Sequence, residues 1–239
     1  MSFLEHLDEL RKRIVNALIA VAVGVLVGFF FITRISEFLL GPTRRLLPPG
    51  SKMIYTQPGE AFSFNVQVAL IAGVVLAAPV IMYQVWMFIA PGLYANEKKL
   101  AIPFVALSTT GFIGGALFNH YIVFVWMMSF FASFNTPDLV FLPRLDDVFD
   151  LYTKMLLGMG LVFQMPTIIY FLAKMKLVTW RFLARNFKYA ILVIFVAAAV
   201  ITPTGDMITQ SIFAAPMLGL YVLGIVIAWL VGPKGKSAE

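Results

Sequence analysis

A carboxylate, Glu97, stands at the end of an aromatic-rich segment, 83–99, that joins two long apolar runs. The segment is too apolar for water at its start and too charged for hydrocarbon at its end, so we expect it to lie at a membrane surface. The dipeptide Pro91-Gly92 prevents a continuous helix there, and Trp86 suits the interface. A carboxylate beside aromatic surface is a candidate docking point for a cation.

A second carboxylate, Glu9, lies in the N-terminal stretch 1–13, whose leucines recur at helical spacing. Arg13 follows four residues later, so an intrahelical ion pair is one interpretation of Glu9. The other interpretation is a carboxylate that recognises an external cation. Both interpretations stay open at this point.

The sequence contains no recognisable catalytic motif. There is no cysteine, and neither His6 nor His120 stands beside a serine or a carboxylate as a triad would require. Motifs for phosphate loops and zinc sites are missing from the sequence as well. We therefore expect no enzymatic activity, no cofactor and no metal, which leaves recognition and passage.

The composition indicates a polytopic, all-α membrane protein. Of the 239 residues, 61% are hydrophobic and 13% are charged, about half the charged fraction of a soluble domain. Several apolar runs are long enough to cross about 30 Å of hydrocarbon. The net charge of +6 is then a matter of membrane topology, and we expect no nucleic-acid binding.

The apolar runs predict six transmembrane helices in a single membrane domain, 1–239. A polar, proline-rich stretch at 34–60 is expected to be a loop. The run 187–201 is short, about 22 Å, and makes a short final hairpin with the run after it. The expected spans are approximately 14–32, 62–86, 100–122, 151–172, 187–201 and 207–231.

The third run is longer than one crossing needs, because 100–134 contains no formal charge over about 52 Å. Charge asymmetry favours one span with an outer extension to 134. Twelve of the eighteen Lys and Arg residues then share one side with both termini, which the positive-inside tendency places in the cytoplasm. His120 falls near the outer end, where an interfacial residue is expected and a proton relay is the alternative.

Gln164 is the polar residue expected nearest mid-depth. Pro166 follows it and lacks an N–H, which frees the carbonyl of Val162. Two unsatisfied polar groups would thus share an apolar slab.

Ordered blocks along the whole chain resemble the TatC family, the multi-span receptor subunit of the twin-arginine protein translocase. The blocks are His6 to Arg13, Leu47 to Gly50 with Met53 to Phe62, Ala78 to Tyr94 with Glu97, and Thr202-Pro203 with Asp206.

This resemblance implies export of folded proteins that carry Arg-Arg signal peptides, driven by the proton-motive force across the bacterial inner membrane. It implies signal-peptide contacts at the positions of Glu9, Arg11, Phe88 and Glu97. The implied partners are the signal peptides, single-span subunits of the TatA and TatB type, membrane lipid and further copies of the chain. Family-supported positions that can be structural are Pro48 and Asp206.

The chain departs from the family at Gln164, where glutamate is usual. An amide can donate and accept hydrogen bonds but cannot titrate, so this departure argues against a protonation role there and leaves a polar contact with a partner helix as the expectation. An ion-coupled transporter of a small solute is the alternative function. It is disfavoured because the halves of the chain show no repeat and the formal charges within the expected spans, Lys154 and Lys188, each lie near a span end.

Overall fold

The computed structural model describes residues 3–47, 53–89, 101–136, 138, 140–202 and 205–232. These residues are almost entirely helical, with no β-strand among them, which confirms the predicted all-α class. The helices are α1 (Phe3–Phe30), α2 (Ile32–Leu46), α3 (Glu60–Ile89), α4 (Ala101–Phe118), the π-helical turn η3 (Asn119–Val123), α5 (Phe124–Ala132), α6 (Leu145–Val162), α7 (Gln164–Lys174), α8 (Trp180–Arg185), α9 (Phe187–Ile201) and α10 (Met207–Val231).

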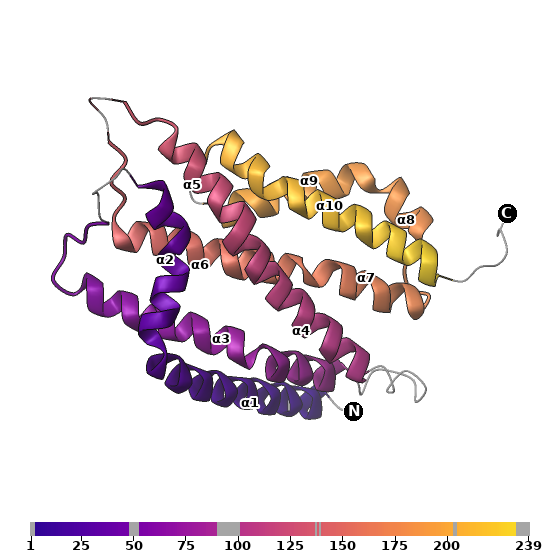
Figure 1. Ribbon diagram of the computed structural model, residues 1–239. Helices are drawn as coiled ribbons and strands as arrows, with labels where there is room; N and C mark the ends of the chain where they lie inside the picture. The colour runs from indigo at the N-terminus through magenta and orange to yellow at the C-terminus, as the bar shows by residue number, and fades with distance from the viewer. Residues whose placement is uncertain are drawn as a thin grey trace.

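The long helices form a slab in which α1 and α3 run side by side along one edge and α9 and α10 along the other (Figure 1). Between these edges, α4, η3 and α5 make one continuous helix that crosses the slab obliquely against α6 (Figure 1). Within the described residues, five helices are long and apolar enough to cross a membrane, and α9 is a shorter apolar helix. The protein is a membrane protein, and both the number of six spans and their expected bounds stay a prediction.

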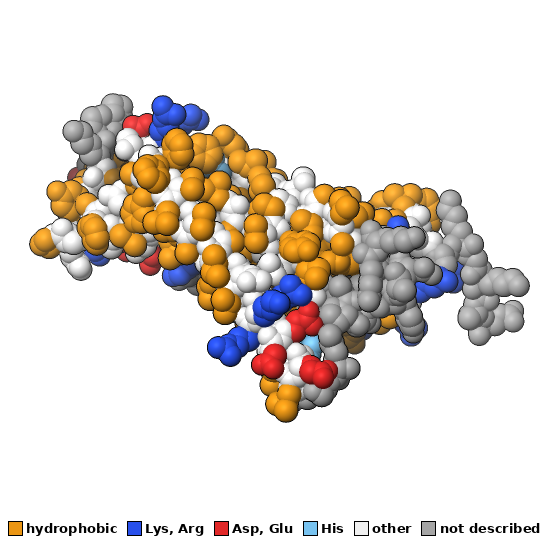
Figure 2. Space-filling model, turned by 90° about the horizontal axis from the view of Figure 1, so that it is seen from below, with side chains coloured by type: hydrophobic (Ala, Val, Ile, Leu, Met, Phe, Trp, Pro, Cys, Tyr) orange, Lys and Arg blue, Asp and Glu red, His pale blue; other side chains and the backbone are white. Residues whose placement is uncertain are grey.

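Hydrophobic side chains are spread across the described part of the face seen in Figure 2, with charged side chains gathered in separate groups. Such a surface suits hydrocarbon, because lipid imposes no penalty on exposed apolar groups. The interior is nevertheless well packed. Its fully buried members include Phe124, Phe149 and Phe213 with Met127, Met155 and Met159, whose flexible thioethers fill irregular gaps between helices.

The expected loop at 34–60 is wrong over its first part, where α2 forms a helix of 15 residues. This helix is amphipathic: Ile35, Leu39 and Leu40 pack into or against the core, while the arginines stay on the outer side. Pro42 is accommodated inside the helix and is buried. Burial of the apolar face therefore outweighs the hydrogen bond that a proline removes.

Candidate functional site

The first turns of α1 meet the last turns of α3 at one end of the slab. Arg13 bridges the two helices: its Nη2 lies 3.0 Å from Glu9 Oε1, and its Nη1 donates to Gln84 Oε1 at 3.4 Å. One turn further out, the ring of His6 stacks on that of Phe88, with centroids 4.6 Å apart. We call these five residues the α1–α3 rim.

The Glu9 carboxylate is largely buried, and only one of its two oxygens accepts a hydrogen bond; we call it half-used. Its side chain is 16% exposed and that of Arg13 is 18% exposed. Glu9 Oε2 and Arg13 Nε have no hydrogen-bond partner in the described part of the chain. A guanidinium and a carboxylate usually pair through two parallel bonds, so this single contact leaves one buried carboxylate oxygen without a donor.

The rim brings together two of the site residues expected from the sequence, Glu9 and Phe88. Arg11 lies on the same turn of α1, and its side chain is exposed. Glu97 and the dipeptide Pro91-Gly92 lie outside the described residues. The sequence interpretation missed Gln84. The signal for it was the presence of an amide side chain among the apolar residues near the end of α3.

Trp86 was expected at the interface, but it is buried beside the rim with 4% exposure. Its ring packs against those of Phe104 on α4 and Phe171 on α7, with centroid distances of 4.9 and 5.9 Å. Three helices therefore meet around one indole. This aromatic cluster fixes the end of α3, and with it the α3 half of the rim.

Glycines allow the two helices of the rim to touch. A Cβ atom added at Gly24 would lie 2.6 Å from the carbonyl oxygen of Gly73, and one at Gly28 would lie 3.1 Å from that of Ala69. Gly24 and Gly28 form a Gly-x-x-x-Gly pattern, which lets backbones approach closely in membranes. The sequence interpretation overlooked this pattern.

Gln164 opens α7 directly after the helix is interrupted at Phe163. Its side chain is 6% exposed, and its Nε2 donates to the carbonyl oxygens of Ser108 on α4, at 2.9 Å, and of Gly160, at 3.4 Å. A Cβ at Gly111 would lie 3.8 Å from the same Nε2. The amide thus ties α7 to a close-packed stretch of α4.

Replacing Gln164 with glutamate is expected to make the thermal stability of the purified chain depend on pH. Only a protonated carboxyl can donate to the Ser108 carbonyl, so the melting midpoint should fall between pH 5 and pH 8 by about 5 °C. Thermal denaturation in detergent at the two pH values measures the shift. Gln164→Leu is the control, since it loses the donor at both values; an equal fall in both variants would contradict the expectation.

Another carboxylate, Glu60, joins two segments at the opposite end of the slab. Its Oε2 accepts from the backbone N–H of Thr56 at 2.8 Å and of Gln57 at 3.2 Å, and its Oε1 accepts from that of Asp146 at 3.3 Å. Arg144 Nη2 lies 3.7 Å from Oε2. The sequence interpretation missed this structural role, for which the turn residues just before Glu60 were a signal. Pro48, which was expected to matter in this region, lies outside the described residues.

Asp206 begins α10 by accepting from the backbone N–H of Thr209 at 2.7 Å. This is the geometry of a helix N-cap, so its structural interpretation has direct support. Gly205 precedes it with φ of 63°, a conformation that favours glycine. Pro203 of the same expected block lies outside the described residues.

His120 is not an interfacial side chain: it is 4% exposed within the bundle. Its ring stacks on Phe38 of α2, with centroids 4.0 Å apart, and its Nδ1 lies 3.0 Å from the hydroxyl of Tyr152. The expected interfacial position of His120 was wrong because it was inferred only from the position of the residue along its helix, without considering which helices pack against it. Helix α2, which was expected to be a loop, covers the histidine from the side.

Comparisons with known proteins agree over almost the whole chain. The sequence profile of the family described as Sec-independent protein translocase protein (TatC) matches residues 5–216. A TatC protein of Koribacter versatilis is 40% identical, covering 99% of this chain and 88% of its relative, and one of Desulforapulum autotrophicum is 41% identical, covering 99% and 87%. A crystal structure of the twin-arginine translocase receptor TatC is 34% identical with a TM-score of 0.82, covering 95% of this chain and 99% of that one. The chain belongs to the TatC family of Sec-independent protein translocase proteins.

Proposed function

We propose that this translocase subunit is a receptor that binds Arg-Arg signal peptides at the α1–α3 rim. The observation that carries the proposal is the half-used Glu9 carboxylate held beside the His6–Phe88 stack. Arg11, from the same turn of α1, and Glu97, from the segment after α3, complete the proposed binding residues. The description of a similar solved chain as a twin-arginine translocase receptor supports the same function.

The chemistry of the rim suits arginine better than lysine. A guanidinium is planar, permanently charged and weakly hydrated, and it can bond both oxygens of a carboxylate. In the rim, Arg13 already binds Glu9 through one oxygen and the other oxygen is buried, so a peptide arginine must displace Arg13 or reach Oε2 through a local rearrangement of the rim. The exposed face of the Phe88–His6 stack offers a cation–π or apolar contact to the second arginine.

Further parts of the proposal concern the translocase as a whole. The asymmetry of Lys and Arg residues supports a bacterial inner-membrane protein with both termini in the cytoplasm. A small fixed scaffold cannot surround a folded cargo, so we propose assembly with single-span TatA- and TatB-type subunits and with further copies, driven by the proton-motive force. Gln164 is the proposed contact for a partner helix, since its Oε1 makes no hydrogen bond to the described residues.

Membranes that contain this chain are expected to cross-link a signal peptide with a photoreactive group beside its Arg-Arg pair. The same peptide with Lys-Lys should give at least about tenfold less product, because the forked hydrogen bonds are lost. Label recovered on this chain, measured by gel after illumination, gives the yield. Equal yields from the two peptides would contradict recognition of paired guanidiniums.

A further inference from the structure

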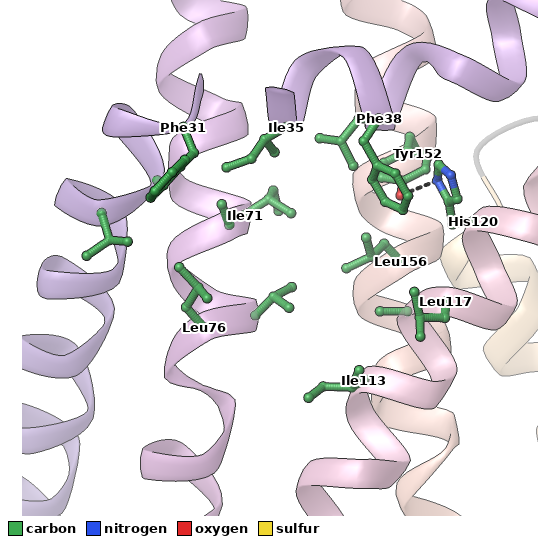
Figure 3. Close-up of a pocket in the computed structure, with 16 residues that line it drawn as sticks. Phe31, Ile35, Phe38, Ile71, Leu76, Ile113, Leu117, His120, Tyr152 and Leu156 are labelled. Carbon is green, nitrogen blue, oxygen red and sulfur yellow. Dashed lines mark hydrogen bonds between the residues drawn. The ribbon is translucent and has the colours of Figure 1, made fainter. Parts of the chain in front are cut away.

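A hollow of about 420 Å³ opens between α3 and α4 beneath α2 (Figure 3). It is nearly three times the size of the ~150 Å³ apolar cavity that holds a benzene ring. Its walls are apolar side chains, and its polar groups belong to His120 and Tyr152 at one end. The apolar residues around it include Phe31, Ile35, Ile71, Leu76, Ile113 and Leu117 (Figure 3).

Lipid can reach this hollow from the side. Leu76 on α3 and Leu117 on α4 line it and are themselves 53% and 45% exposed on apolar helices. An opening between two such helices faces hydrocarbon, in which a water molecule would find few partners. The chemistry of the walls therefore fits an acyl chain.

A second hollow, of about 460 Å³, lies on the other side of Phe38, between α2 and the segment formed by η3 and α5. Phe38 and His120 line both hollows, so their stacked rings divide one space from the other. The second hollow differs in charge, because Glu37 and Arg45 contribute to its wall. An apolar space and a charged space thus adjoin along α2.

His120 supplies a polar contact at the division. The side chain is 4% exposed, its Nδ1 lies 3.0 Å from the Tyr152 hydroxyl, and its Nε2 makes no hydrogen bond to the described residues. A histidine held in one orientation by a stack and a hydrogen bond can offer its remaining nitrogen to a ligand. A phosphate or ester oxygen is a suitable partner for an N–H at this nitrogen.

The wall of the second hollow carries one negative and one positive side chain, which do not form an ion pair with each other. Glu37 and Arg45 are exposed residues two turns apart on α2, about 12 Å along its axis, and neither takes part in an ion pair within the described residues. A headgroup that carries both a phosphate and an ammonium can lie between such a pair if the two long side chains extend toward it from α2. Phosphoethanolamine is a headgroup of this kind.

We propose that the two hollows hold one phosphatidylethanolamine molecule from the leaflet against which α2 lies. An acyl chain fills the apolar hollow, the phosphate lies toward Arg45 and His120, and the ammonium lies toward Glu37. The lipid would then brace α2 against α3 and α4. This proposal does not depend on the proposed binding of signal peptides.

Native mass spectrometry of the purified full-length chain, titrated with phosphatidylethanolamine, tests the proposal. The wild-type chain should retain one lipid at low concentration. Val75→Trp, which fills the apolar hollow, should abolish this binding, while Val80→Trp, on the same helix outside the hollow, should leave it unchanged. Leu117→Trp replaces the first variant if Val75→Trp does not fold.

The headgroup is tested separately. Arg45→Gln should weaken binding about fivefold, and Arg34→Gln, an exposed arginine of α2 that lines neither hollow, should not. Wild type should prefer phosphatidylethanolamine to phosphatidylglycerol, and Glu37→Gln should remove that preference. Undiminished lipid binding by the tryptophan variants, or cross-links showing a helix of a second copy in the apolar hollow, would overturn the proposal.

Discussion

Glu9→Gln is expected to reduce cross-linking of an Arg-Arg signal peptide to this chain by about 10- to 100-fold. The amide keeps the size of the side chain but removes the charge that a guanidinium pairs with, and hydrogen bonds to charged groups contribute about 1.5–3 kcal/mol. The carboxylate lies at the α1–α3 rim with one oxygen unused. Quantified photo-cross-linking in membranes measures the effect. Asp8→Asn is the matched control, since Asp8 is an exposed neighbour outside the rim contacts.

An indirect effect must be separated from this direct one, because Glu9→Gln also leaves Arg13 without its carboxylate. The double variant Glu9→Gln/Arg13→Gln removes both charges together. If Glu9 binds the peptide, cross-linking stays low in the double variant, and it stays high in Arg13→Gln alone. Recovery of cross-linking in the double variant would instead attribute the loss to an unpaired arginine and would contradict the direct role.

Helices formed by mainly apolar runs were predictable from the sequence. The expected runs 187–201 and 207–231 coincide with α9 and α10, because each is bounded by turn or capping residues. Helix α2 was not predicted, because Pro42 and the arginines were given more weight than the apolar spacing. In the structure, burial of that apolar face decides the conformation.

The candidate site could be predicted only in part. The sequence placed Glu9 and Phe88 on one membrane face from topology and family resemblance, and the structure places both in the rim. The bond from Arg13 to Gln84 joins residues 71 positions apart, and periodicity carries no information about such a contact. The burial of His120 depends likewise on Phe38, from a helix that was not expected.

The glycine contact between α1 and α3 leads to the second large effect: Gly73→Leu is expected to separate these helices. A Cβ at position 73 would lie 2.5 Å from Val25 Cγ2, 2.7 Å from Val25 N and 3.0 Å from the carbonyl oxygen of Val21. Two of these three atoms are backbone and cannot move aside without shifting α1. Overpacking typically costs about 1–3 kcal/mol and occasionally more, so the melting midpoint should fall by about 5–10 °C.

Gly219→Leu is the matched control, because Gly219 lies inside α10 and a Cβ there meets nothing within 4 Å. Leucine has the higher helix propensity, so this control should melt at or above the wild-type temperature. Since the rim depends on the same helix pair, Gly73→Leu should also reduce signal-peptide cross-linking although it touches no rim residue. Equal melting midpoints for the two variants would show that α1 and α3 can move apart at little cost, and the close glycine contact would then not be what positions Glu9 beside Phe88.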